Sequence, residues 1–264
     1  MSDRITSPST STPIMPRLSA SVSNGLPTNV SYRAVQNGKL DVEYDLTKKA
    51  YVLVFHHNKF KDRSHNRPGS DKDMRKINDF FKDYRCTVRV CNDYRLNQVR
   101  RTMDEVSKMN AGPYSCVIVI LMSHGMDDDT IMAYDGDMYS FEDDIVEKCT
   151  SNHKLAGKPK IFILQACRGD SIMQADAKRT TSNKCDIVTF QSTYKGNIAY
   201  RNPQEGSVFI QHLFEQLHKN KNGSIIEINT QLNYIFRNNS ISQCPTMSTT
   251  LQKKLIFGHL CKSK

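Results

Sequence analysis

Short apolar runs alternate with amphipathic stretches along most of this chain, beginning at about residue 45. Two of the runs, 114–125 and 158–167, are almost uniformly apolar, as β-strands covered on both faces are. Shorter apolar runs, which we also interpret as strands, occupy 50–57, 86–92, 186–193 and 253–260. Stretches with apolar residues at helical spacing predict helices at 70–84, 97–109, 140–150, 207–220 and 224–238.

The order of these elements predicts the fold class. Strand and helix alternate through the first four strands, a pattern typical of α/β proteins with a parallel sheet. We therefore expect a mostly parallel six-stranded sheet flanked by helices on both faces, which is a three-layer sandwich. Ser70 is the expected N-cap of the first helix. Asp135 and Gly136 mark a hairpin turn within 130–139, and the polar stretch 168–185 predicts a loop.

Residues 1–44 are predicted to form a disordered N-terminal tail. Most of this segment is rich in Ser, Thr and Pro and poor in aromatic residues, so it cannot bury enough apolar surface to offset the entropy of ordering it. No apolar run approaches the length of a membrane-spanning helix, and no signal-peptide pattern opens the chain. We therefore expect a cytoplasmic protein without a membrane partner.

Charge and cysteine content narrow the class of function. The formal net charge is +10, but the basic residues are spread along the chain and no RNA-binding motif accompanies them. We therefore predict a solvated basic surface and no nucleic-acid partner. The eight cysteines form no CxxC pair, so we expect no metal and no cofactor. No GxGxxG or GxxxxGK[ST] motif occurs, which argues against a nucleotide-binding or flavin-binding fold.

Two of the predicted strands end in residues that can carry out chemistry. The strand at 114–125 ends in Ser-His-Gly, and the strand at 158–167 ends in Gln-Ala-Cys. Because the carboxyl ends of adjacent parallel strands meet at one edge of a sheet, we expect His124 and Cys167 to lie side by side. The imidazole can activate the thiol as a nucleophile and later protonate a leaving amine. The amides of Gly125 and Cys167 are candidates for an oxyanion hole.

These motifs resemble the signatures of the caspase family. The pentapeptide QACRG stands at Gln165–Gly169, and the tripeptide SHG stands at Ser123–Gly125. Three further segments agree in order, namely RPGSD at Arg67–Asp71, YRNPQEGSVFIQ at Tyr200–Gln211 and KKLIF at Lys253–Phe257. The resemblance extends from about Tyr44 to the C-terminus.

The resemblance implies a cysteine endopeptidase that cleaves proteins after aspartate in programmed cell death. It assigns catalysis to a dyad of Cys167 and His124. It assigns binding of the P1 aspartate carboxylate to Arg67, Gln165 and Arg201. Guanidinium groups suit this role because they pair with carboxylates in bidentate fashion. The partners it implies are protein substrates with a P1 aspartate, a second copy of the chain in a homodimer, an upstream caspase and inhibitor-of-apoptosis proteins.

The segment before Arg201 departs from the family pattern. Caspases usually have YSWRN here, whereas this chain has IAYRN, so Ile198 and Tyr200 replace two aromatic residues of the S2 wall. Ala199 replaces a serine beside the P1 pocket, and Ser123 is also expected among the subsite residues. These changes remove no catalytic atom. They motivate an alternative function, that of a catalytically weak or inactive homologue that regulates an active caspase by dimerisation.

The resemblance also implies a zymogen with a short prodomain at 1–44. A large subunit at 45–176 and a small subunit at 177–264 would be joined by a linker at about 169–184, with Asp176 as the candidate cleavage site. The predicted last strand, which contains KKLIF, would pair with its twin across the two-fold axis of the homodimer.

Several remaining candidates are interpreted as structural residues. Cys116 and Cys149 are predicted to lie in the core, because reduced cysteines often pack as small hydrophobes. Four histidines have no matching cysteine and are interpreted as solvated, namely His56, His57, His65 and His153.

Overall fold

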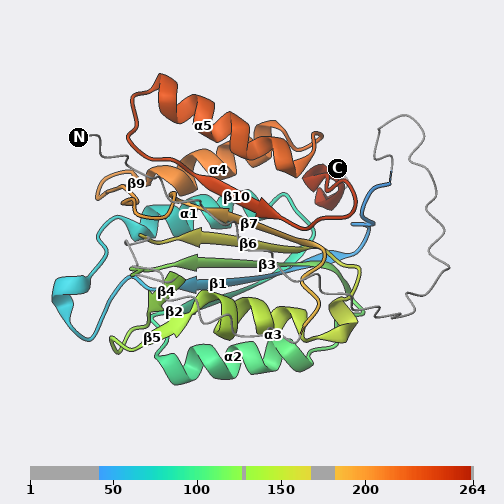
Figure 1. Cartoon of the computed structure of the whole chain (residues 1–264), viewed down its shortest axis with the longest axis horizontal. Coiled ribbons are helices and arrows are strands. Elements are labelled where there is room, and N and C mark those ends of the chain that lie inside the picture. The colour runs from blue at the N-terminus through green and yellow to red at the C-terminus, as the bar shows by residue number, and fades with distance from the viewer. Residues whose placement is uncertain (1–41, 127–128, 168–181, 263–264) are drawn as a thin grey trace, which may run out of the picture. The chain divides into compact units, whose positions relative to one another are not determined.

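A computed structural model describes residues 42–126, 129–167 and 182–262. Six strands form its central sheet (Figure 1), in the order β10 (Thr246–Thr249), β7 (Ile187–Gln191), β6 (Lys160–Gln165), β3 (Tyr114–Met122), β1 (Lys49–His56) and β2 (Cys86–Asn92). The strands from β7 to β2 are parallel to one another, and β10 is antiparallel to β7. The predicted six-stranded, mostly parallel sheet is confirmed.

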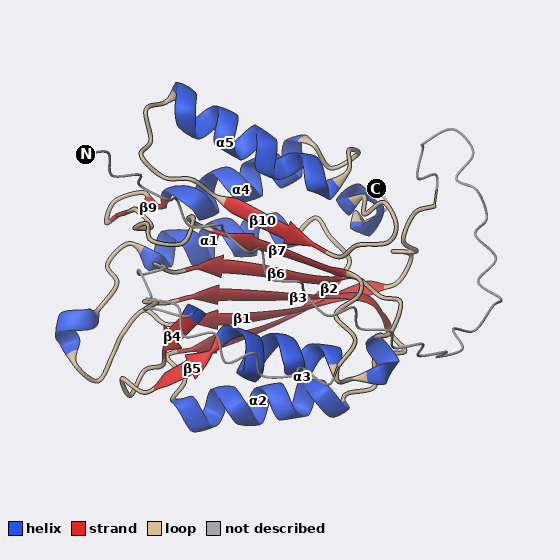
Figure 2. Cartoon of the chain, in the orientation of Figure 1, coloured by secondary structure: helices blue, strands red, loops and turns tan. Residues whose placement is uncertain are grey.

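Helices cover both faces of this sheet (Figure 1, Figure 2). On one face lie α1 (Ser70–Phe81), α4 (Val208–Lys219) and α5 (Ile228–Asn238). On the other face lie α2 (Leu96–Lys108) and the short α3 (Glu147–Thr150). The three-layer arrangement is therefore confirmed. No helix in the described part of the chain is long and apolar enough to span a bilayer.

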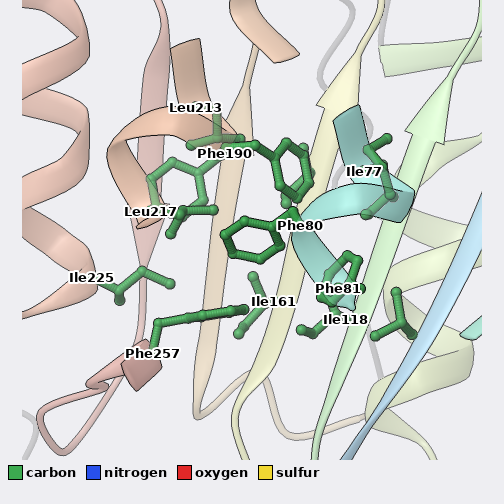
Figure 3. Packing of buried hydrophobic residues seen from close by; sticks show 14 of the residues in the cluster. Ile77, Phe80, Phe81, Ile118, Ile161, Phe190, Leu213, Leu217, Ile225 and Phe257 are labelled. Carbon is green, nitrogen blue, oxygen red and sulfur yellow. The ribbon is translucent and has the colours of Figure 1, made fainter. Parts of the chain in front are cut away.

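The larger hydrophobic core lies between the sheet and the layer of α1, α4 and α5. Figure 3 shows Phe80 of α1 among side chains from the sheet and from α4, and its ring centroid lies 5.0 Å from that of Phe214. A second core lies on the opposite face of the sheet. Because both faces are covered, β3 and β6 are buried over almost their whole length, which accounts for their uniformly apolar sequences.

Helix α1 begins one residue earlier than its predicted cap implies. Gly69 occupies the N-cap position with a φ of 87°, and Ser70 is the first helical residue. A left-handed backbone of this kind favours glycine, and a Cβ atom on Gly69 would lie 2.6 Å from the carbonyl oxygen of Asn202. The Ser70 hydroxyl therefore does not cap the helix. It forms hydrogen bonds with Arg67 and His56 instead.

The predicted strand at 253–260 is wrong. The sixth strand of the sheet is β10, which precedes this segment. Within the segment, Lys254 and Ile256 form isolated bridges with Glu43 and Ser224, and a short 3-10 helix follows at Phe257–Leu260. The apolar residues here pack into the core beneath the helices instead of pairing in the sheet. The true edge strand is made of Thr, Met and Ser and has little apolar signal.

Two small hairpins accompany the sheet. β4 (Thr130–Met132) pairs with β5 (Met138–Ser140) around Gly136, whose φ of 89° favours glycine, so this predicted hairpin is confirmed. β8 (Arg201–Asn202) pairs with β9 (Gly206–Ser207), a hairpin that the sequence pattern did not predict.

Tyr44 lies where the predicted tail meets the folded domain. Its side chain is buried, and its hydroxyl donates a hydrogen bond to Asp186 at 2.6 Å. The predicted tail up to residue 41, and residues 169–181 of the predicted linker, lie outside the described residues.

Candidate active site

The strands β3 and β6 bring His124 and Cys167 to one edge of the sheet. The two strands pair in parallel with Met122 opposite Gln165, so His124 and Cys167 each lie two residues beyond the last pair. The amide of Ser123 donates to the Gln165 carbonyl at 3.1 Å, which extends the contact past the strand ends. The predicted nucleophile and base therefore belong to adjacent backbone segments.

Gly125 shows how closely these segments approach each other. A Cβ atom at this position would overlap the carbonyl oxygen of Cys167 and lie 2.9 Å from the Cβ of Ala166. Only glycine permits this approach without a backbone shift. The amides of Gly125 and Cys167 thus come from neighbouring stretches of chain, as an oxyanion hole requires.

A buried hydroxyl holds the turn before Cys167. Ser192, which follows β7, donates from Oγ to the Ala166 carbonyl at 2.9 Å and accepts from the Ala166 amide at 3.3 Å. Sequence analysis did not single out Ser192, because a lone serine after a strand carries no signal of its own. Ser123, expected among the subsite residues, is buried and donates from Oγ to the Met132 carbonyl at 2.6 Å. We therefore assign Ser123 to the support of the β4–β5 hairpin.

The imidazole of His124 is held by the loop after β1. Its Nε2 lies 2.7 Å from the backbone carbonyl oxygen of His65, so in the neutral ring Nε2 carries the hydrogen and donates it. Nδ1 is then the basic nitrogen. The ring packs against Phe60 and His65, with centroids 5.3 and 6.0 Å away. No sequence pattern points to the His65 carbonyl, because every residue has one.

The surroundings of His124 favour its neutral form. Burial is the main cause that lowers the pKa of this imidazole below the ordinary value of 6.5. The hydrogen bond to His65 opposes this effect of burial, and the positive charges of Arg67 and Arg201 lower the pKa further, so that the pKa as a whole is lowered. The ring is therefore available to accept a proton at neutral pH.

Cys167 differs from the cysteines of the core. Its side chain is partly exposed, whereas Cys116 and Cys149 have no exposed surface, which confirms their predicted place in the core. Burial raises the pKa of each of those two thiols to about 12. They stay protonated and unreactive at neutral pH, while Cys167 lies beside a base at the edge of the sheet.

Arg67 is entirely buried, and only one of its three guanidinium nitrogens forms hydrogen bonds with the described residues. Its Nη1 donates to the carbonyl oxygen of His57 at 2.8 Å and to Ser70 Oγ at 3.1 Å. Nε and Nη2, which share one edge of the guanidinium plane, have no hydrogen-bond partner among the described residues. Burial lowers the pKa of Arg67 to about 9, so the group is still cationic at pH 7. An unpaired cationic edge of this shape fits a carboxylate.

Arg201 and Gln165 supply the other predicted groups of the pocket. Arg201 lies in β8, is partly exposed, and donates from Nε to the Pro68 carbonyl at 3.1 Å. After burial, the positive charge of Arg201 is the second cause that lowers the pKa of Arg67. The two guanidinium groups therefore lie near each other. Gln165 is buried two residues before Cys167, and its Oε1 has no partner in the described part of the chain.

A buried carboxylate supports the two arginines. Asp73 of α1 accepts hydrogen bonds from the amide and hydroxyl of Ser207 and from Nε2 of Gln211, at 2.8, 2.6 and 3.0 Å. Burial raises its pKa, while its negative charge favours the charged forms of Arg67 and Arg201. Sequence analysis missed Asp73, which looks like any acidic residue in the first turn of a helix.

The residues expected to form the subsite wall lie in the loop between β7 and β8. Ile198 and Tyr200 are 64% and 45% exposed, and Ala199 is half-buried. The buried Gln243 fixes this loop, because its Oε1 accepts from the Tyr200 amide at 2.9 Å and its Nε2 donates to the Ser192 carbonyl at 2.5 Å. Gln243 precedes β10 and was not predicted as part of the site.

Two of the histidines interpreted as solvated are in fact buried. His56, the last residue of β1, is 6% exposed, and His57 has no exposed surface. The ring of His56 bonds to Ser70 and Asn92 and that of His57 bonds to Tyr139, so both lie between packed elements. His65 and His153 are exposed, as predicted. The candidate cleavage site Asp176 lies outside the described residues.

A thiol and an imidazole on adjacent strand ends, where Gly125 packs closely against the backbone of Cys167, form the arrangement of a cysteine protease domain. Comparison with known proteins identifies the family. A family model described as Caspase domain matches residues 49–256. The chain therefore belongs to the caspase family.

Individual relatives agree with this assignment. Caspase-14 of Homo sapiens is 29% identical over 214 residues, which cover 72% of this chain and 87% of that protein. Caspase-7 of Gallus gallus is 29% identical over 236 residues, which cover 81% of this chain and 76% of that protein. The crystal structure of Caspase-1 from Spodoptera frugiperda has the same fold, with a TM-score of 0.71 at 23% identity over 85% of this chain and 95% of that chain.

Proposed function

We propose that this protein is a cysteine endopeptidase that cleaves proteins after aspartate. The observation that carries the proposal is the unpaired edge of the buried Arg67 guanidinium, close to Arg201 and to the pair of His124 and Cys167. A neutral P1 side chain would leave buried donors unpaired, at a cost of about 1–3 kcal/mol. A basic P1 side chain would be repelled by both arginines.

In the proposed reaction, Cys167 Sγ attacks the carbonyl carbon of the bond after aspartate. His124 accepts the thiol proton at Nδ1, and the amides of Gly125 and Cys167 stabilise the oxyanion. When the tetrahedral intermediate collapses, the C–N bond breaks, the proton passes from His124 to the leaving amine and a thioester remains on Cys167. Water deprotonated by the same imidazole then hydrolyses the thioester and regenerates the thiol.

The family relationship supports the wider role that the sequence predicts. We propose a cytoplasmic zymogen of programmed cell death, activated by an upstream caspase through cleavage at Asp176 and restrained by inhibitor-of-apoptosis proteins. The homodimer would form through the free edge of β10, the true end of the sheet. Exposed Ile198 and Tyr200 would offer an apolar surface to the residue before the aspartate.

Peptide cleavage tests the central proposal. Two peptides that differ only in aspartate or asparagine before the cut are incubated with the purified protein, before and after cleavage of the linker. We expect the aspartate peptide to be cleaved about 100-fold more efficiently, because only a carboxylate pairs with the guanidinium edge. The Cys167→Ala variant should show no turnover. Equal cleavage of the two peptides would contradict the proposal.

A regulatory homologue without activity is the second candidate, and the unusual residues Ile198, Ala199 and Tyr200 motivate it. It predicts heterodimers with an active caspase and little reaction of Cys167 with an aspartyl chloromethylketone. Stoichiometric labelling of Cys167 by that reagent would reject this candidate, because labelling requires both a reactive thiolate and a working P1 pocket.

A further inference from the structure

A chain of hydrogen-bonded polar side chains leads from Arg67 through the buried Ser70 and His56 to Asn92. Arg67 Nη1 donates to Ser70 Oγ at 3.1 Å, and Ser70 Oγ lies 2.9 Å from Nε2 of His56. Nδ1 of His56 in turn lies 3.0 Å from Oδ1 of Asn92, at the end of β2. Ser70 has no exposed surface and His56 is 6% exposed, so water does not compete for the two bonds of Ser70, whereas Asn92 is exposed at the end of β2.

Chemistry determines the direction of each bond in this chain. Ser70 Oγ accepts from Arg67, which leaves its single hydrogen to be donated to Nε2 of His56. That nitrogen must be unprotonated, so His56 carries its hydrogen on Nδ1 and donates it to Asn92. Burial lowers the pKa of His56, in agreement with a neutral ring. The side chains of Arg67, Asp73 and Asp93 contribute the charges that act on it.

The chain restricts the orientation of the Arg67 guanidinium. One Nη1 hydrogen is bound by the carbonyl oxygen of His57 and the other by Ser70 Oγ, so the planar group is held at Nη1. Its opposite edge, with Nε and Nη2, is thereby kept in one direction. Bidentate pairing with a carboxylate depends on that direction, because both bonds must form at once.

We propose that His56, Ser70 and Asn92 are positioning residues that orient Arg67 for the P1 aspartate. The inference rests on the proposed function and deepens it, since it explains how aspartate is distinguished from its neutral isostere. None of the three residues is placed in contact with substrate. A neutral imidazole suits this role, because it accepts the Ser70 hydrogen without adding a positive charge beside a cation that already lies near Arg201.

The test is the ratio of kcat/KM for the aspartate peptide to kcat/KM for the asparagine peptide. Ser70→Ala and His56→Phe each break the chain, and we expect each to lower the ratio about tenfold, the effect of one misplaced charged hydrogen bond. Ser70→Thr keeps the hydroxyl and should restore the ratio of the wild type. A merely structural role would lower cleavage of both peptides by the same factor and leave the ratio unchanged.

Tyr139→Phe is the matched control. It removes a buried hydroxyl that lies 3.2 Å from Nε2 of the adjacent His57 but belongs to no bond with Arg67, so the ratio should stay the same. Thermal unfolding identifies variants that do not fold, and Ser70→Ala, the smallest change, decides the outcome if His56→Phe is among them. If the wild type prefers the aspartate peptide and Ser70→Ala leaves the ratio unchanged, the positioning role alone is overturned. A wild type without preference overturns the proposed function and this inference together.

Discussion

Arg67 and Arg201 have the same proposed role in different surroundings. Arg67 has no exposed surface and bonds to the backbone of His57, just after β1, and to Ser70, so a substitution there disturbs folding as well as recognition. Arg201 is partly exposed, and its Nε donates a hydrogen bond to the Pro68 carbonyl. Arg201 is therefore the better position at which to separate substrate recognition from stability.

Arg201→Gln should reduce kcat/KM for a P1 aspartate peptide about 100-fold, because one charge-assisted contact to the carboxylate is lost. The melting temperature should change little, since no buried partner is left unpaired. Steady-state kinetics and thermal unfolding measure the two effects. Arg237→Gln, at an exposed position of α5, is the control and should alter neither. Wild-type kinetics in Arg201→Gln would remove this residue from the pocket.

The pH dependence of cleavage follows from the state of His124. Because burial and the two arginines lower its pKa, the basic form persists below pH 6.5 and is lost only as the pH falls through the lowered value. The acid limb of kcat/KM should therefore lie below that of an ordinary histidine, in a profile measured from about pH 4 to 8. An acid limb above pH 6.5 would be inconsistent with this account of the base.

At the scale of elements, the pocket depends on contacts between segments that are far apart in the sequence. Asp73 in the first turn of α1 bonds to Ser207 at the end of β9 and to Gln211 in α4. Gly206 makes this possible, because a Cβ atom there would overlap the Asp73 carboxylate. Helix α1, which follows the turn that carries Arg67, and the hairpin that carries Arg201 are in this way attached to each other through one carboxylate.

Asp73→Asn should weaken this attachment. The amide keeps one acceptor oxygen and presents an NH₂ group where Ser207 now donates, so we expect a loss of about 1–3 kcal/mol in the free energy of unfolding, measured with urea. KM for a P1 aspartate peptide should rise as well, since the negative charge that supports both arginines is lost. Asp71→Asn, whose partner Arg75 is exposed, is the control and should cost less than about 1 kcal/mol. Equal stability of the two variants would contradict the supporting role of Asp73.

At the scale of the whole molecule, the sheet ends in an edge strand that has no neighbour within the described chain. β10 pairs with β7 on one side, and Ser248 and Thr249 in it are exposed. Such an edge pairs readily with a second strand, and a two-fold axis would bring the same residues of two copies close together. This is the structural basis of the proposed homodimer.

Ser248→Asp should weaken the homodimer. Like charges near a two-fold axis face each other, so we expect the dimer dissociation constant to rise at least about tenfold. Sedimentation equilibrium measures this constant, and low salt should enlarge the effect. Ser151→Asp, at an exposed position after α3, is the control and should leave the constant unchanged. A monomeric wild type, or a Ser248→Asp variant that dimerises normally, would contradict assembly through β10.

The sequence by itself determined the alternation of strands and helices, because each element carries its own hydrophobic period. It also determined that His124 and Cys167 lie together, since both end strands whose apolar runs predict a parallel sheet. The family signatures pointed to Arg67, Gln165 and Arg201. Each of these inferences depends on local pattern, or on a motif that lies within a few residues.

Only the tertiary structure decided which polar atoms are buried and which of them lack a partner. The unpaired edge of Arg67, the burial of His56 and the roles of Asp73 and Gln243 arise where segments distant in the chain meet, as with the bonds between Asp73 and Ser207, 134 residues apart. The same reason explains why β10, and not the apolar segment after it, closes the sheet. Burial is a property of what packs around a residue, and no local pattern contains it.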